Sequence, residues 1–242
     1  MNIFDNFFFV ALPYAALLIF FAGTIVRYRT TKFSVSSLSS QFLESGSLFW
    51  GSVPFHFGII LLFFGHLIAF LFPETLMAFN GQTMRLLIIE ITAFAAGLLL
   101  LFGLVRLLFR RTTNERIQVV TTKMDIFIEL LIITQVILGL CVAYFNPWGS
   151  SWFAASITPY LNSIFMFNPD ISVVSAMPWL LKSHIIGAYL IVIMFPFSRL
   201  VHVLVMPLHY VWRPYQRVLW NYGRRDVRDT NTKWTQHRPK NT

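Results

Sequence analysis

Long apolar runs that hold almost no charged residue dominate this chain. Four uncharged runs cover residues 7–26, 45–73, 130–169 and 183–198, and a fifth, 86–105, is interrupted only by Glu90. About 20 apolar residues are enough for a helix to cross a bilayer. Only 12% of the 242 residues are charged, whereas soluble domains average about 25%. The runs therefore predict an integral membrane protein.

The same runs predict an all-α fold, an integral membrane bundle of five transmembrane helices. The expected spans are residues 6–27, 48–72, 86–109, 124–146 and 180–206. We expect a membrane domain over residues 1–206 and a basic cytoplasmic C-terminal tail over 207–242. Residues 146–178 are rich in Trp, Phe and Pro, which predicts a short amphipathic or re-entrant element on the outer face.

The placement of the basic residues predicts the orientation of the bundle. Seventeen of the nineteen Lys and Arg residues fall within 27–44, within 106–123 or after 198, and the exceptions are Arg85 and Lys182. Basic loops stay in the cytoplasm, so we expect the N-terminus outside and the C-terminus inside the cell membrane, crossed several times. The net charge of +9 thus reflects topology and contact with membrane lipid, and no nucleic acid is expected as a partner.

Cysteine usage excludes several kinds of site in this chain. Its single cysteine, Cys141, lies in an apolar segment. One cysteine cannot form an internal disulfide, a cysteine zinc site or an iron–sulfur cluster. Any redox chemistry would need another type of ligand.

Four histidines lie inside the apolar segments: His56 and His66 in the second, His184 and His202 in the fifth. Ionisable groups within a bilayer are costly and usually functional. With the two spans running in opposite directions, His66 and His184 fall near the outer face, and His56 and His202 near the inner face. The helical rise gives about 15 Å and about 27 Å along the two spans, a mismatch that tilt and a kink at Pro196 can absorb.

Two depth-matched histidine pairs predict two bis-histidine b-type haems, with the four histidines as axial ligands of the iron. The spacing of eighteen residues from His184 to His202 corresponds to five whole helical turns, so both should face the same way. The alternative for any one of these residues is a hydrogen-bonded packing histidine. His209 is a rival ligand on the same face, although Pro207 intervenes. His237 lies in a polar stretch and is expected at the surface.

Around these histidines the chain resembles a known family. The stretches FHFGIILLFFGHLIAFLFP (55–73) and SHIIGAYLIVIMFPFSRLVH (183–202), with FFFVALPYAALLIFFAGTIVRYR and SSQFLE nearer the start, resemble the gamma subunit of respiratory nitrate reductase. That family is a membrane dihaem cytochrome b. The resemblance covers about residues 1–110 and 180–222.

The resemblance implies a division of labour among the site residues. His66 and His184 would hold the distal, outer haem b, and His56 and His202 the proximal, inner one. Quinol would be oxidised beside the outer haem, near Gly65 and His66. Arg85 stands where the family has a lysine; because arginine keeps its proton, it would anchor a quinone oxygen or a propionate.

The implied function is quinol oxidation coupled to nitrate respiration. The subunit would oxidise menaquinol or ubiquinol near the outer face. Electrons would then pass through the two b haems to a cytoplasmic iron–sulfur (beta) subunit and on to a molybdenum catalytic (alpha) subunit that reduces nitrate. Arg199, three residues before His202, is a possible contact for an inner propionate, or else simply reaches the interface.

Two other functions remain open from the sequence. The chain could be the cytochrome b of another quinone-linked complex, such as a sulfite- or heterodisulfide-reductase-like assembly. A different class is a membrane anchor or transporter, in which Glu90 and Glu129 would belong to a proton path.

Overall fold

The computed structural model describes residues 3–36, 40–41, 43–205 and 231 of the chain. The chain divides into two units, Met1–Val205 and Met206–Thr242. Apart from Asn231, the predicted tail at 207–242 lies outside the described residues, and the fold below is that of the first unit.

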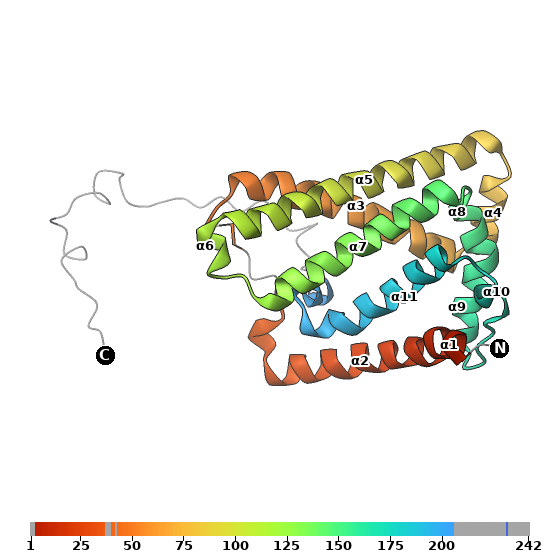
Figure 1. Cartoon of the computed structure of the whole chain (residues 1–242), viewed down its shortest axis with the longest axis horizontal. Coiled ribbons are helices and arrows are strands. Elements are labelled where there is room, and N and C mark those ends of the chain that lie inside the picture. Colours follow the sequence, from red (N-terminus) through yellow and green to blue (C-terminus); the bar gives the residue numbers. More distant parts are fainter. Residues whose placement is uncertain (1–2, 37–39, 42, 206–230, 232–242) are drawn as a thin grey trace. The chain divides into compact units, whose positions relative to one another are not determined.

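Among the described residues, every regular element is helical, and five helical stretches are long and apolar enough to cross a membrane (Figure 1). They are Ile3–Thr30 (α1, Ile3–Asn6; η1, Phe7–Ala11; α2, Leu12–Thr30), Gly46–Leu71 (α3), Thr83–Thr113 (α5), Lys123–Phe145 (α7) and Trp179–Phe197 (α11, Trp179–Met194; η4, Phe195–Phe197). The predicted all-α fold with five spans is confirmed. Shorter elements join them: η2 (Lys32–Ser34), α4 (Pro73–Asn80), α6 (Glu115–Gln118), α8 (Gly149–Trp152), η3 (Phe153–Ile157), α9 (Thr158–Phe165), α10 (Ser172–Ser175) and η5 (Arg199–Val205).

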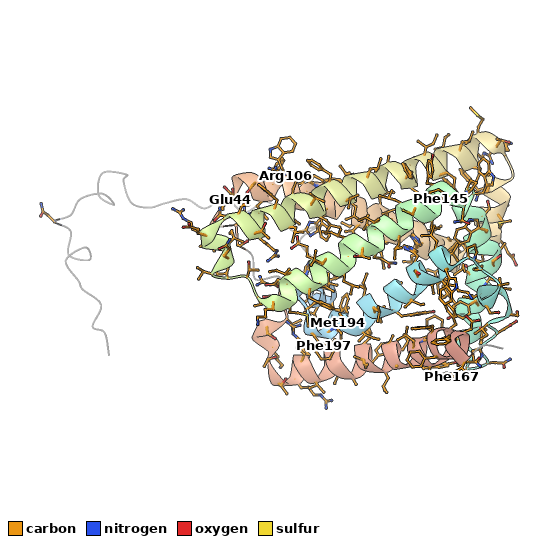
Figure 2. All side chains as sticks on the ribbon, viewed as in Figure 1. Glu44, Arg106, Phe145, Phe167, Met194 and Phe197 are labelled. Atoms are coloured by element: carbon orange, nitrogen blue, oxygen red, sulfur yellow. The ribbon has the colours of Figure 1, made fainter. Side chains whose placement is uncertain are left out.

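The spanning helices pack side by side in the order α3, α5, α7, α11, α2 (Figure 1). At one end of the bundle, α2 and α5 finish and α3 and α7 begin. Arg27, Arg110 and Arg111 lie there, so we call it the basic end. Figure 2 places Glu44 and Arg106 toward this end and Phe145 and Phe167 at the opposite one. We call the opposite end the capped end, because α4, α8, η3, α9 and α10 gather there. The short element predicted within 146–178 is therefore present as four short helices.

Small residues let α3 and α5 approach closely. A Cβ on Gly58 would lie 2.8 Å from the Ala96 carbonyl oxygen, and one on Gly103 would lie 2.5 Å from the Phe55 nitrogen. Close packing of this kind favours helix association in a membrane. The hydrophobic effect contributes little there, because side chains that leave lipid are already in an apolar solvent. Large apolar side chains on the outer surfaces, such as Phe57 and Phe63, are 69% and 60% exposed. This exposure is typical of lipid-facing helices.

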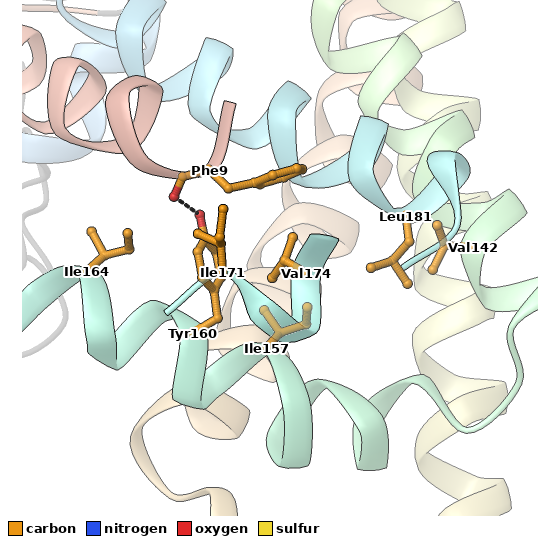
Figure 3. Close-up of a cluster of buried hydrophobic side chains, with 8 residues drawn as sticks. All are labelled: Phe9, Val142, Ile157, Tyr160, Ile164, Ile171, Val174 and Leu181. Carbon is orange, nitrogen blue, oxygen red and sulfur yellow. Dashed lines mark hydrogen bonds between the residues drawn. The ribbon is translucent and has the colours of Figure 1, made fainter. Parts of the chain in front are cut away.

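Pro13 explains a local change of helix type near the N-terminus. Proline has no N–H, so it cannot bond the carbonyl four residues earlier, which here belongs to Phe9. That carbonyl instead accepts a hydrogen bond of 2.9 Å from the Tyr160 hydroxyl (Figure 3), and residues 7–11 form a π-helical turn. The contact fixes α9 to the first span within a core of Phe9, Val142, Ile157, Tyr160, Ile164, Ile171, Val174 and Leu181.

The fifth span differs from the prediction. The α-helix ends at Met194 rather than continuing to 206, and 3-10 turns follow. Pro196 interrupts the hydrogen-bond ladder, and Ser198 is extended (φ −108°, ψ 179°). Arg27 of α2 stabilises the break, because its Nη1 donates to the carbonyl oxygens of Pro196 and Ser198 at 2.6 and 2.7 Å. His184 and His202 therefore do not share one face of one continuous helix.

Candidate functional site

His66 on α3 lines a cavity at the capped end. A main-chain carbonyl can only accept, so the 2.8 Å contact from His66 Nδ1 to the Leu62 oxygen requires a proton on Nδ1. The Nε2 lone pair is then free to bind a metal ion, the arrangement usual for ligating histidines. The ring edge also packs against Phe153, with 5.5 Å between ring centroids.

His184 on α11 lines the same cavity. Its ring lies against Gly139 of α7, where a Cβ would come within 2.9 Å of His184 Cε1. Gln135, one turn earlier on α7, donates from Nε2 to the His184 carbonyl oxygen at 2.9 Å. In the described part of the chain the buried His184 Nδ1 has no hydrogen-bond partner. The structure thus brings the predicted outer pair together, from α3 and α11.

The cavity between these two histidines suits a planar apolar group. Its volume is about 640 Å³, within the range of about 300–1,000 Å³ for ligand sites. Most of its wall is apolar, and a Cβ added to Gly65 would meet no atom within 4 Å. Open space beside Gly65, two histidines and an unpartnered ring nitrogen fit a bis-histidine haem. His66 and Gly65, both predicted for the quinol site, line this cavity.

The predicted inner pair lies toward the basic end. His56 Nδ1 donates to the Ser52 carbonyl oxygen at 2.7 Å, and His202 Nδ1 donates to the Arg199 carbonyl oxygen at 2.6 Å. Both rings are therefore oriented with Nε2 available. Phe55 and Leu200, which are close neighbours of the two histidines in sequence, pack against one buried cluster: Leu100, Leu104, Ile128, Ile132 and Val136. Neither histidine lines the cavity at the capped end, and a second haem site between His56 and His202 stays a prediction.

Arg199 is held by protein groups. Its Nε and Nη2 donate to the Asp125 carboxylate at 2.6 and 2.8 Å, and Nη2 also donates to the Val120 carbonyl oxygen at 3.0 Å. Asp125 in turn accepts from the backbone N–H of Thr122, which caps α7. Contact of Arg199 with a propionate stays a prediction.

Arg85 does not join the cavity. Its guanidinium carbon lies 5.3 Å from the ring centroid of Phe79, and Arg85 is not among the residues that line the space between His66 and His184. The start of α5 instead turns its third residue outward, since Arg85 is exposed. Of the three residues predicted for the quinol site, Gly65 and His66 thus line the cavity and Arg85 lies at the surface.

The cavity lining includes residues that were not predicted for this site, among them Gln135, Gly139, Tyr189 and Glu90, the last considered only for a proton path. Gln135 and Gly139 are four residues apart, so they share a face of α7, and a lone Gln in an apolar span was a usable signal. Nothing in the sequence indicates that this face meets His184. The rival ligand His209, and His237, lie outside the described residues.

Comparison with known proteins gives a consistent result. A family model described as nitrate reductase gamma subunit matches residues 5–221. The nitrate reductase gamma chain of Bacillus subtilis (strain 168) is 33% identical over 207 residues, which cover 84% of this chain and 93% of that protein. Two chains of Escherichia coli (strain K12) are also similar. Respiratory nitrate reductase 2 gamma chain is 33% identical, over 88% of this chain and 95% of its own length.

The second, respiratory nitrate reductase 1 gamma chain, is 30% identical over 223 residues, which cover 90% of this chain and 98% of that protein. The matches extend over nearly the whole length on both sides, and the family model includes all four intramembrane histidines. The chain therefore belongs to the nitrate reductase gamma subunit family.

Proposed function

We propose that this chain is the quinol-oxidising, electron-transferring membrane subunit of a respiratory nitrate reductase. His66 and His184 would hold one haem b near the outer face, and His56 and His202 a second haem b near the inner face. The observation that carries the proposal is the cavity of about 640 Å³ at the capped end, because histidines from two non-adjacent helices line it.

The residues of the chain supply ligation, orientation and an apolar surround. When bound, a b-type haem supplies a one-electron carrier. Hydrogen bonds from Nδ1 of His56, His66 and His202 to main-chain oxygens fix these rings with Nε2 free. Gly139 makes room for the His184 ring, and Gln135 holds the His184 backbone. Rigid ligands on packed helices favour electron transfer because little has to move.

Charge supports an orientation with the basic end in the cytoplasm. Among the described residues, Arg27, Arg110, Arg111 and Arg199 all lie at that end. The positive-inside rule then places the N-terminus and the capped cavity outside, in the cell membrane. The basic end would face an iron–sulfur beta subunit and, through it, a molybdenum alpha subunit.

Family membership favours this function over the two alternatives. The similar proteins are named as nitrate reductase gamma chains, which argues against a sulfite- or heterodisulfide-reductase-like complex. The transporter reading depended on Glu90 and Glu129. These residues lie at opposite ends of the bundle, where Glu90 binds Ser150 and Glu129 pairs with Arg111.

Quinol-driven nitrate reduction in membranes that hold the whole complex tests the proposal. We expect His66→Ala to remove the outer haem and abolish this activity. Nitrate reduction driven by a reduced dye, which feeds electrons to the partner subunits directly, should survive. Retained quinol-driven activity in His66→Ala would refute the assignment of the site.

A further inference from the structure

We propose that Glu90 of α5, which lines the capped-end cavity, is the residue that accepts the protons of a quinol bound beside the outer haem. The inference rests on the proposed function and adds a catalytic residue to it. Arg85, which the resemblance suggested for this region, lies outside the cavity. Glu90 lines it together with His66 and His184.

Glu90 is the only carboxylate among the described residues that line the cavity, and Lys and Arg are absent from those lining residues. It is partly buried in a spanning helix, seven residues after α5 begins. An ionisable group at such a depth is costly to keep and is usually functional. Quinol oxidation needs a proton acceptor beside the quinol hydroxyl. His66 and His184 would not be available as acceptors, because in the proposed function both bind the iron of the outer haem.

The surroundings of Glu90 orient its carboxylate. Glu90 Oε1 accepts hydrogen bonds from the backbone N–H and the hydroxyl of Ser150, at 2.8 and 2.6 Å. Asn80, the last residue of α4, donates from Nδ2 to the Ser150 hydroxyl oxygen at 3.0 Å. With its oxygen accepting from Asn80, the hydroxyl is directed to donate to Glu90. Both bonds fall on Oε1, so no hydrogen bond occupies Oε2 among the described residues.

Two further features lie close to this contact in the chain. Trp148, just before α8, adopts a left-handed backbone conformation (φ 67°), which is uncommon for a bulky residue. Asn80 is 7% exposed, and its Oδ1 has no hydrogen-bond partner in the described part of the chain. Asn80 Nδ2 donates to the hydroxyl groups of Ser150 and Ser151, so the end of α4 and α8 are joined beside Glu90.

The chemistry is a balanced proton and electron transfer. A haem bound at this site would take the electrons of the quinol one at a time. With each electron, one quinol O–H bond would break and its proton would form a new O–H bond on Glu90. Glu90 then gives this proton to water at the capped end. A second event of the same kind removes the second electron and proton, and leaves the quinone.

A purely structural role for Glu90 would be to tie α5 to α8 through Ser150. Glu90→Gln separates the two roles, because its amide oxygen still accepts from Ser150 but cannot take up a proton at ordinary pH. Ser150→Ala does the reverse, since it removes the hydroxyl that donates to Glu90 and accepts from Asn80, and keeps the carboxylate. Glu74→Gln is the matched control, because it makes the same charge change on exposed α4 at the same end.

The experiment uses the whole complex in membranes, without nitrate, and follows reduction of the haem absorbance by duroquinol in a stopped-flow instrument. Dithionite-reduced spectra first measure the haem content of each variant. We expect Glu90→Gln to keep its haem and to be reduced roughly 100-fold or more slowly, the usual contribution of a general base. Glu90→Asp should recover part of the rate. Ser150→Ala and Glu74→Gln should change it by less than about tenfold.

Two results would overturn the assignment of Glu90. One is a Glu90→Gln rate within roughly threefold of wild type, well below the effect of a lost general base. The other is loss of haem from both Glu90→Gln and Glu90→Asp, which would make Glu90 a structural residue. Failure of the proposed function is a separate outcome, because the wild-type complex itself would then show no quinol-dependent haem reduction.

Discussion

The two ends of the bundle keep polar groups within apolar surroundings in different ways. At the basic end, ion pairs dominate: Arg110–Glu44 and Arg199–Asp125 at 2.6 Å, and Arg111–Glu129 at 2.9 Å. At the capped end, most contacts are hydrogen bonds with neutral partners, such as Gln135 to His184 and Ser150 to Glu90. Among the residues that the structure describes, the exception at this end is one buried ion pair, Lys182–Asp5 at 3.0 Å.

The difference agrees with our proposal that quinol is oxidised at the capped end, whereas ion pairs at the basic end hold the helices together. Ion pairs hold neighbouring helices together, and removal of one partner lowers the stability of the fold because it leaves the other charge buried and unpaired. At the capped end, an apolar cavity is lined by His66, Glu90 and His184. Substitutions at the capped end should therefore alter ligand binding and rate, and those at the basic end should alter stability and the inner ligand.

The largest expected effect separates the ends by their histidines. His184→Ala should remove the outer haem and abolish reduction by quinol, whereas His202→Ala should remove the inner haem and leave quinol able to reduce the outer one. Dithionite-reduced and quinol-reduced spectra of the two variants measure this directly. Quinol reduction that survives in His184→Ala and disappears in His202→Ala would reverse the assignment of the ends.

Two glycines sharpen the account of the cavity. Gly139→Ala puts a methyl group 2.9 Å from His184 Cε1, so the ring must move; we expect reduced outer-haem content and a cost of about 1–3 kcal/mol from overpacking. Gly65→Ala meets no protein atom within 4 Å, so the haem-free protein should keep its stability. A haem bound beside Gly65 would, however, contact the added methyl group, so we expect Gly65→Ala to bind haem more weakly than wild type. Equal haem content in Gly65→Ala and wild type would show that no group occupies that space.

Asp125→Asn tests the ion-pair scaffold at the basic end. It weakens the partner of Arg199, whose main-chain oxygen orients His202. We expect a loss of about 3 kcal/mol, as for a broken buried pair, and a shifted redox midpoint for the inner haem only. Thermal unfolding in detergent and a redox titration measure the two effects. A shift of the outer haem instead would mean that the ends are not independent.

The smallest expected effect concerns Glu44, outside the spans. Hydrogen bonds from Ser47 and then Arg110 lower the pKa of Glu44 from 4.5 to about 2. A lowered pKa stabilises the fold above pH 4.5, and this contribution is lost as the pH falls from there toward 2. Because Glu44 is partly exposed, we expect at most about 1 kcal/mol. The melting temperature of Glu44→Gln, measured from pH 7 to 3, should depend less on pH than that of wild type, and an identical dependence would contradict the assignment.

The spans could be predicted from the sequence because apolar length alone decides whether a helix can cross a bilayer. The end of α11 could not be predicted so simply. Pro196 was identified as a kink, but the helix stops there because Arg27, from a distant part of the chain, provides donors for the carbonyl groups of Pro196 and Ser198. Such a donor depends on how α2 packs against α11, which a hydropathy pattern does not contain.

The candidate site shows the same limit. His66 and His184 could be paired from depth alone, and the structure places both on one cavity. Arg85 was expected beside them, but the five residues from Arg85 to Glu90 leave these side chains about 140° apart around α5, and the cavity receives Glu90 instead. Gln135 and Gly139 matter through contact with α11, which only the packed helices reveal.

The number of b-type haems per chain in the purified complex tests the central claim most directly. Pyridine haemochrome analysis, with the protein quantified by amino-acid analysis, gives this ratio. Two paired-histidine sites predict two protohaems per chain, both low-spin. A ratio of one, or of zero, would contradict the claim that His56, His66, His184 and His202 together bind two haems.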